Sequence, residues 1–364
     1  MESSIVANTI AAIAVVIMVL GLAWVFYPAW LVAMAPETKW TILRNNEDDS
    51  NEAKSATTAE HKIVLSLVIP AYNEEERIPI MLQSAHDFLQ STQGIEVLDK
   101  LNQVGLKHNH GDQENDKRTI SVEWIVVDDG SVDKTCEVVT KVMKSIQSKN
   151  YLWKIVSLEK NCGKGAAIKT GMSIAKGHYS LMVDADGATD FGPGLQKLVD
   201  NLFSVHNDGG ANNRNMIAVF GSRAHLQGES TAKRSLVRSF LMWAFHFFVR
   251  ILVSSTIQDT QCGFKLFDQQ AARLIFGNLH LQRWAFDTEV VCLCHLLQVT
   301  MLEVAVPWQE IEGSKLSTSK FALAMASITM LRDMICVRLC YTLRLWTASS
   351  SSLQPQSNSK RKSS

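Results

Sequence analysis

A short apolar run that ends in two carboxylates decides the fold of this chain: Tyr179-Ser180-Leu181-Met182-Val183-Asp184-Ala185-Asp186. A run of this kind, followed at once by polar residues, is typical of a buried strand that leads into a loop. Mg²⁺ is commonly held by one or two carboxylates together with substrate phosphates. The stretch therefore predicts a site for Mg²⁺ or Mn²⁺ and a phosphate-bearing substrate, with Asp184 and Asp186 as the metal ligands.

Apolar runs alternate with helical patterns on both sides of this stretch. We expect strands at residues 63–69, 124–127, 155–158, 179–183 and 217–220, with amphipathic helices between them. Such alternation predicts an α/β fold in which helices cover both faces of a mostly parallel sheet. Asn73 is expected to cap the first helix, with Glu76 in the capping-box position. The polar segments 92–118 and 207–215 are expected to be inserted surface loops.

Polar residues follow three of the predicted strands. In parallel sheets, ligands bind beyond the carboxyl ends of the strands. A carboxylate there can accept hydrogen bonds from a ribose hydroxyl or a base N–H, so the substrate is expected to be a nucleotide. The alternative for the segment that begins at Asp128 is a plain turn with a helix cap at Ser131 or Asp133. The polar groups are Pro70-Ala71-Tyr72-Asn73-Glu74, Asp128-Asp129-Gly130-Ser131 and Asp184-Ala185-Asp186.

A glycine-rich turn, Gly163-Lys164-Gly165, precedes another predicted helix. It differs from the dinucleotide-binding fingerprint, because Ile168 stands where the third glycine belongs and the acidic position further on is doubled. We therefore do not expect a nicotinamide cofactor. Lys164 is a candidate for binding the nucleotide-linked substrate, or else it orders the turn.

The N-terminus carries a long apolar segment with no charged residue from Ser3 to Pro36. About 20 apolar residues span a bilayer as a helix, so residues 1–36 are expected to form a membrane anchor. A cleaved signal peptide is the alternative, but the segment is too long and has no basic region before it. Lys39 and Arg44 follow the span, which predicts a cytosolic position for the rest of the chain. Residues 37–62 are expected to be a polar linker.

Two apolar segments in the second half of the chain contain charged residues, at 236–257 and 321–346. A charge at the centre of a spanning helix costs roughly 2.5 to 3.5 kcal/mol on insertion scales. We therefore expect 236–257 to be an interfacial helix and 321–348 an amphipathic, membrane-associated helix, with ordinary core helices as the alternative. Residues 349–364 are expected to be a disordered basic tail.

Basic residues come just before the first of these segments, at Arg223, Arg234 and Arg238. Arginine suits bidentate recognition of phosphate. Phosphate-binding groups beside a membrane-facing helix predict a lipid phosphate as second substrate, and a solvated basic surface is the alternative.

Composition excludes some other functions. The 36 basic and 36 acidic residues balance, which gives no support for a nucleic-acid partner. The seven cysteines are scattered and have no zinc-site spacing, so we expect reduced thiols that are mostly in the core.

Four ordered motifs resemble the family-2 glycosyltransferases of GT-A fold, over residues 63–320. They are the three strand-end groups above and Asn161-Cys162-Gly163-Lys164-Gly165. Within that family the chain resembles the dolichyl-phosphate β-glucosyltransferases. The further features are the single anchor and the stretches Gly221-Ser222-Arg223, Asp259-Thr260-Gln261-Cys262-Gly263-Phe264-Lys265, Arg283-Trp284-Ala285-Phe286-Asp287-Thr288-Glu289 and Gly313-Ser314-Lys315-Leu316.

This resemblance implies an inverting transfer of glucose from UDP-glucose to dolichyl phosphate. The products would be dolichyl β-D-glucosyl phosphate and UDP, made at the cytosolic face of the endoplasmic reticulum membrane for protein N-glycosylation. It also implies residue roles. The donor would be held by Pro70, Tyr72, Glu74 and Asp128 or Asp129, and the metal and diphosphate by Asp184 and Asp186.

The remaining implied roles concern catalysis and the two phosphates. Asp186 would be the main catalytic carboxylate, and Asp287 would be a second one or else structural. Arg223 and Arg234 match acceptor-phosphate positions of related mannosyltransferases. Those relatives carry an arginine upstream of the Ser-Lys-Leu element that is absent here, so Lys315 is the candidate for the donor phosphate.

Three alternatives stay open from the residues alone. The first is another polyprenyl-phosphate glycosyltransferase, such as a GDP-mannose-dependent dolichyl-phosphate mannosyltransferase, because the carboxylates cannot separate the two donors. The second is a membrane-anchored nucleotidyltransferase, which would release pyrophosphate. The third is a catalytically silent membrane scaffold.

Overall fold

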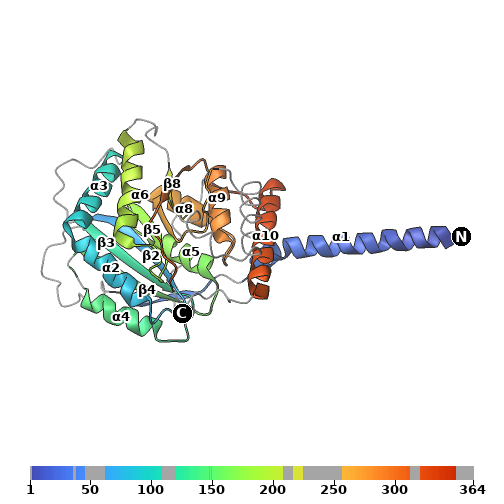
Figure 1. Ribbon diagram of the computed structural model, residues 1–364, viewed down its shortest axis with the longest axis horizontal. Coiled ribbons are helices and arrows are strands. Elements are labelled where there is room, and N and C mark those ends of the chain that lie inside the picture. Colours follow the sequence, from blue (N-terminus) through green and yellow to red (C-terminus); the bar gives the residue numbers. More distant parts are fainter. Residues whose placement is uncertain are drawn as a thin grey trace, which may run out of the picture.

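The computed structural model describes residues 2–35, 38–45, 62–108, 120–146, 148, 150–207, 216–223, 256–311 and 320–349. A long N-terminal helix, α1 (Glu2–Met34), stands apart from an α/β domain (Figure 1). The other elements are β1 (Trp40–Asn45), β2 (Lys62–Ala71), α2 (Ile78–Gln90), α3 (Thr92–His108), β3 (Ile120–Asp128), α4 (Thr135–Ser145), β4 (Tyr151–Leu158), α5 (Lys164–Ile174), β5 (Tyr179–Val183), α6 (Phe191–Asn207), β6 (Ile217–Ser222), β7 (Phe264–Asp268), α8 (Gln269–Asn278), α9 (Phe286–Leu296), β8 (Thr300–Ala305) and α10 (Lys320–Thr342).

The strands of the described ranges form one sheet in the order β1-β4-β3-β2-β5-β7-β6-β8. The central strands β4, β3, β2 and β5 are parallel. β7 is antiparallel to both β5 and β6, and β1 is antiparallel to β4. The carboxyl ends of β2, β3, β4 and β5 therefore meet at one edge, as the sequence predicts. The α/β class and the five expected strands are confirmed, whereas β1, β7 and β8 were not expected.

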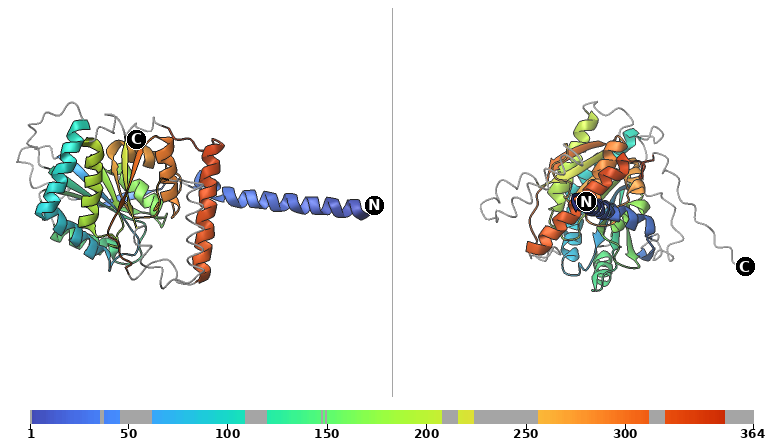
Figure 2. Two further views of the ribbon diagram at one scale, coloured as in Figure 1. Left: turned by 45° about the horizontal axis from the view of Figure 1, so that its top comes forward. Right: turned by 90° about the vertical axis from the view of Figure 1, so that its right-hand side faces the viewer.

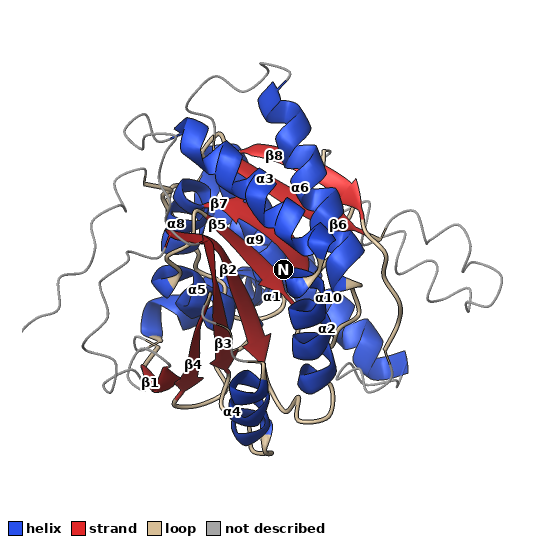
Figure 3. Ribbon diagram, turned by 90° about the vertical axis from the view of Figure 1, so that its left-hand side faces the viewer, coloured by secondary structure: helices blue, strands red, loops and turns tan. Residues whose placement is uncertain are grey.

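Helices cover both faces of this sheet (Figure 3). One core contains side chains of α2, α3, α4 and α6 with those of alternate strand residues such as Leu65, Leu67 and Ile69. The other contains α5, α8, α9 and α10 with the intervening residues such as Val68 and Ile125. Successive strand side chains point to opposite faces, so each central strand contributes to both cores. This double burial explains why these strands are mainly apolar, with Ser66, Glu123 and Lys154 as buried polar exceptions.

Three expectations about local structure are wrong. The segment 92–118 is not a loop along its whole length, because α3 occupies Thr92–His108. The supposed linker 37–62 contains β1, which pairs with β4. Asn73 does not cap α2, which begins at Ile78 with Pro79 in its first turn. Asn73 instead has a positive φ of 53° and accepts a hydrogen bond from the Val132 amide.

Two helices, α1 and α10, contact each other at one end of the molecule. α10 runs across the base of α1 in the views of Figures 1 and 2. Residues Ala14–Met34 of α1 are long and apolar enough to cross a membrane. The α10 side chain of Arg332 lies 5.7 Å from the ring centres of Trp24 and Tyr27 on α1. The expected interfacial helix at 236–257 lies outside the described residues, apart from its last two positions.

Candidate active site

The loops after β2 and β3 hold each other at the carboxyl edge of the sheet. The backbone amides of Asn73 and Glu74 donate to the hydroxyls of Ser131 and Thr135, at 2.8 and 2.7 Å. The Glu74 carboxylate accepts two hydrogen bonds from Arg77, at 2.6 and 2.7 Å. The sequence-predicted groups Pro70–Glu74 and Asp128–Ser131 are thus brought together, and Glu74 already has a cationic partner.

Asp128 and Asp129 face different surroundings, although they are neighbours in the chain. The two carboxylate oxygens of Asp129 accept hydrogen bonds from the amides of Cys162 and Gly163, at 2.7 and 2.8 Å. Burial raises the pKa of Asp129, and these hydrogen bonds oppose the rise. Asp128 accepts longer hydrogen bonds from the Ser131 amide at 3.3 Å and the Ser157 hydroxyl at 3.5 Å, and it also has a side-chain hydrogen bond with Cys136. Asp129 therefore positions the glycine-rich loop, and Asp128 is the better candidate for contact with a nucleotide.

The glycine-rich loop packs tightly against the segment that leads into α9. Gly163 has a φ of 106°, and a side chain on it would lie 2.6 Å from the carbonyl oxygen of Gln282. The Ala166 amide donates to that same carbonyl at 3.0 Å. The loop thus needs glycine for both its conformation and its close packing. It presents Lys164 at the first position of α5.

Lys164 and Asp184 form an ion pair, with Nζ 2.6 Å from Oδ1. Burial lowers the pKa of Lys164, but the charges of Asp184, Asp287 and Asp186 prevail and raise it. The Asp184 amide donates to the Gly263 carbonyl at 3.1 Å. A methyl group on Gly263 would overlap the Asp184 carboxylate. The backbone of Gly263 thus forms a close-fitting support behind Asp184.

Asp186 lies in the same group of charges. Its Oδ1 accepts a hydrogen bond from the Ala188 amide at 3.0 Å. Burial, together with the negative charge of Asp184, raises the pKa of Asp186. A cation beside the two carboxylates would relieve this repulsion.

Asp287 has a buried cationic partner. Its Oδ1 lies 2.6 Å from Nζ of Lys265, and these side chains are 4% and 1% exposed. The same ammonium group donates to the Cys262 carbonyl at 2.5 Å. Burial raises the pKa of Asp287, and Lys265 and Lys164 oppose the rise. The contacts support the structural role that the sequence left open for Asp287, because they fix α9 to β7, the strand that begins directly after Gly263.

Removing one partner of this pair is expected to destabilise the protein strongly. Asp287→Ala should lower the free energy of unfolding by about 3 to 5 kcal/mol, because it leaves the Lys265 charge buried and unpaired. The double substitution Asp287→Leu with Lys265→Met should recover most of that loss. Thermal unfolding in detergent measures both effects. A stable Asp287→Ala protein with a large loss of turnover would instead show a catalytic role.

Arg223 is held by Asp259. Its Nε and a terminal nitrogen donate to the Asp259 carboxylate, at 2.8 and 2.9 Å. Its guanidinium also lies 5.4 Å from the ring centre of Trp308. Burial raises the pKa of Asp259, but the bonds and charge of Arg223 prevail and lower it. Both groups are therefore charged at neutral pH. The other predicted phosphate-binding residues, Arg234, Arg238 and Lys315, lie outside the described residues.

Curated proteins from several eukaryotes are similar to most of this chain. The dolichyl-phosphate beta-glucosyltransferase of Dictyostelium discoideum is 40% identical over 78% of this chain and 76% of its own length. The enzymes of that name from Homo sapiens and Saccharomyces cerevisiae are 40% and 36% identical over 78% and 79% of this chain, and 77% and 78% of their own lengths. The chain belongs to this family. The profile described as Glycosyl transferase family 2 also matches residues 114–274.

Solved structures show a more distant likeness, in the fold alone. Glucosyl-3-phosphoglycerate synthase of Mycobacterium tuberculosis is 15% identical with a TM-score of 0.42, over 76% of this chain and 79% of that chain. Mannosyl-3-phosphoglycerate synthase from Rubrobacter xylanophilus is 14% identical with a TM-score of 0.43, over 80% of this chain and 78% of that chain.

The carboxylate pair of this family member fits a divalent cation shared with a substrate. The carboxylates of Asp184 and Asp186 carry hard oxygen atoms, and together with Asp287 they outnumber the two ammonium groups of Lys164 and Lys265. Within the described ranges, no three carboxylate, histidine or thiol groups converge on a metal site. Mg²⁺ needs no such cage, because substrate phosphates and water supply its remaining ligands.

Sequence reasoning missed the residues that support the predicted ones. Asp259 and Gly263 were noted as parts of a motif, but without a role. The role of Gly263 could have been predicted from its position in the sequence, because a glycine close to a charged strand residue indicates a close backbone approach. The pairing of β5 with β7, which places Val183 opposite Phe264, then brings Gly263 beside Asp184. All seven cysteines are free, as expected.

Proposed function

We propose that this chain transfers glucose from UDP-glucose to dolichyl phosphate, with inversion at the anomeric carbon. The products are dolichyl β-D-glucosyl phosphate and UDP, and the glucolipid serves lipid-linked oligosaccharide assembly in protein N-glycosylation. The observation that carries this proposal is the identity of 35 to 40% with dolichyl-phosphate β-glucosyltransferases over most of the chain. Carboxylates at three strand ends and an apolar helix at the N-terminus support it.

The donor lies along the carboxyl edge of β2, β3 and β5. The uridine contacts Pro70, Tyr72 and Asp128. Glu74 and Asp129 position the surrounding loops, Glu74 through Arg77 and Asp129 through the amides of Cys162 and Gly163. Asp184, Asp186 and Lys164 adjoin the diphosphate, with Lys315 as a further phosphate ligand. A nucleotide bound here therefore meets two carboxylates and one ammonium group at its phosphate end.

The acceptor needs little activation. A phosphate monoester has its second pKa near 6, so it is largely dianionic at neutral pH and attacks the anomeric carbon without a general base. Asp184 and Asp186 would hold Mg²⁺ or Mn²⁺, which would supply Lewis-acid stabilisation to the departing diphosphate. Lys164 adds a fixed positive charge there, and Arg223, Arg234 and Arg238 orient the acceptor phosphate. The tasks of the protein are thus positioning and charge stabilisation.

The membrane places the lipid substrate. α1 anchors the chain in the endoplasmic reticulum membrane, with the domain at residues 63–320 on the cytosolic face. α10 crosses the base of α1 (Figure 2), and this arrangement supports a position of α10 along the membrane surface. Its side chains Met325 and Ile328 are each 47% exposed, which suits contact with lipid.

Competition between two donors tests the proposal. Membranes that contain the protein are incubated with dolichyl phosphate and either labelled UDP-glucose or labelled GDP-mannose. We expect label to enter the lipid from UDP-glucose alone, with release of UDP. Label entering from GDP-mannose alone would overturn the glucosyl assignment, and release of pyrophosphate would indicate a nucleotidyltransferase.

A further inference from the structure

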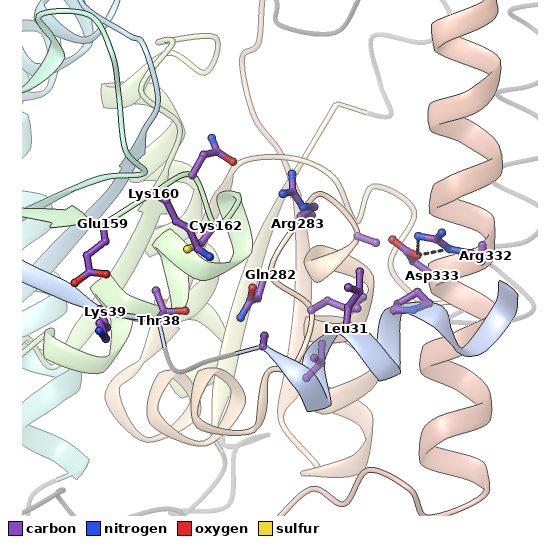
Figure 4. Close-up of a pocket in the computed structure, with 16 residues that line it drawn as sticks. Leu31, Thr38, Lys39, Glu159, Lys160, Cys162, Gln282, Arg283, Arg332 and Asp333 are labelled. Carbon is purple, nitrogen blue, oxygen red and sulfur yellow. Dashed lines mark hydrogen bonds and ion pairs between the residues drawn. The ribbon is translucent and has the colours of Figure 1, made fainter. Parts of the chain in front are cut away.

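A cavity of about 480 Å³ lies where the anchor helix meets the catalytic domain (Figure 4). It is separate from the group of charges around Asp184. One side is apolar and comes from the last two turns of α1, including Pro28, Leu31 and Val32. Volumes of 300 to 1,000 Å³ are usual for small-molecule sites. The size suits the end of a lipid rather than a single ion.

The opposite side of the cavity is polar and mostly basic. Lys39, Lys160 and Arg283 line it, and within the described part of the chain no ion pair involves any of them. Arg332 also lines it, but its charge is neutralised by Asp333 at 2.7 Å. Glu159 is the remaining acidic residue of the lining. The cavity therefore offers three cationic groups against one unpaired carboxylate.

The position of the cavity relates these charges to the bilayer. Trp24, Tyr27 and Trp30 lie near the domain end of α1, and Trp and Tyr favour the level of the lipid headgroups. The cavity begins at Pro28, at that same level. Lysine and arginine beside an apolar helix at headgroup depth attract lipid phosphate. A hydrocarbon chain can leave such a cavity along the α1 side without entering water.

We propose that this cavity binds a phosphate-bearing membrane lipid, with the phosphate at Lys160 and Arg283 and the hydrocarbon chain along α1. The inference rests on the proposed function, which brings a polyprenyl phosphate to this membrane surface. A polyprenyl phosphate and an ordinary anionic phospholipid share the chemistry of the site. Both carry a phosphate on a long apolar chain.

The cavity is one loop away from the reaction centre. Its lining includes Asn161 and Cys162, and the Cys162 amide is fixed by Asp129. Arg283 precedes Trp284, whose ring lies 5.9 Å from Nζ of Lys164. A phosphate bound at Arg283 therefore contacts the segment that packs against the glycine-rich loop. A polyprenyl phosphate bound at Arg283 would occupy a site that precedes the reaction centre, before glucose is transferred to it.

Lipid retention by the full-length protein tests the site. The protein is placed in phosphatidylcholine nanodiscs that contain a small fraction of dolichyl phosphate, phosphatidic acid or neutral dolichol, and bound lipid is counted by native mass spectrometry. Lys160→Gln with Arg283→Gln should weaken the binding of a phosphate-bearing lipid about 10- to 100-fold, as expected for lost hydrogen bonds to a charged group. Dolichol binding should not change.

Matched variants control for charge and for added bulk. Lys141→Gln with Arg273→Gln removes two exposed cations from α4 and α8, and should leave retention unchanged. Val32→Trp fills the apolar side and should also displace the lipid, whereas Ile17→Trp on a lipid-facing part of α1 should not. Equal retention by the cavity variants and their controls would overturn the proposal.

The two lipids distinguish the source of the phosphate. Loss of dolichyl phosphate binding with a raised KM for that acceptor would show an acceptor site. Loss of phosphatidic acid binding alone, with an unchanged KM, would show a headgroup site. UDP binding should be the same in all variants. If the wild-type protein transfers no glucose but the cavity variants still lose lipid, the site stands and the proposed function fails.

Discussion

Asp186→Asn is expected to lower the rate of glucosyl transfer on the order of 10²- to 10³-fold, a loss typical of removing one preorganised stabilising group. The substitution keeps the size of the side chain but removes its charge. Burial raises the pKa of Asp186, and the negative charge of the neighbouring Asp184 adds to the rise. A divalent cation held by the two carboxylates would compensate the repulsion between them. An amide at position 186 therefore weakens the site for the cation and leaves the departing diphosphate less stabilised.

Mn²⁺ binding and turnover together check this prediction. Mn²⁺ titrated into the protein with UDP should bind more weakly to Asp186→Asn than to the wild type, and kcat should fall even at saturating UDP-glucose. Asp190→Asn changes an exposed carboxylate of the same loop and should have little effect. Near-normal transfer by Asp186→Asn with excess Mg²⁺ or Mn²⁺ would rule out Asp186 as the metal ligand.

The parallel centre of the fold could be predicted because its strands carry mainly apolar residues on both faces. β5 has the expected bounds, and β2, β3 and β4 extend the predicted runs by a few residues. β7 was not predicted because Lys265 interrupts its apolar pattern. This lysine is fully buried, and its partner Asp287 comes from α9. α3 was predicted as a loop because it contains many polar residues. Its apolar residues nevertheless recur at helical spacing and are buried, namely Val97, Leu98, Leu101 and Val104.

The candidate site was predictable where chemistry is local and not where it depends on long-range pairing. Asp184 and Asp186 lie at a strand end that the sequence itself defines. Asp129 differs in role from Asp128 because it accepts hydrogen bonds from the Cys162 and Gly163 amides, which are more than 30 residues away along the chain. The pairing of Arg223 with Asp259 likewise joins residues 36 positions apart. Such contacts follow from the order of the strands, which apolar patterns do not specify.

Gly263→Ala is expected to reduce transfer about 100-fold or more, although Gly263 carries no reactive group. Its φ does not lie in the left-handed region, so the backbone itself accepts alanine. The added methyl group would overlap the carboxylate of Asp184 and force it away from Lys164. Displacement of this carboxylate disturbs both the predicted metal site and the ammonium group beside the diphosphate.

A double-mutant cycle separates this effect from general damage to the fold. If Gly263→Ala acts by displacing Asp184, it should cost little further activity in an Asp184→Ala background, because the carboxylate it displaces is already absent. Gly105→Ala is the matched control, since its methyl group would lie at an ordinary 3.6 Å from the His178 ring. Turnover and thermal unfolding are measured for each variant. Additive losses of turnover at Gly263 and Asp184 would show that Gly263 acts independently of the carboxylate.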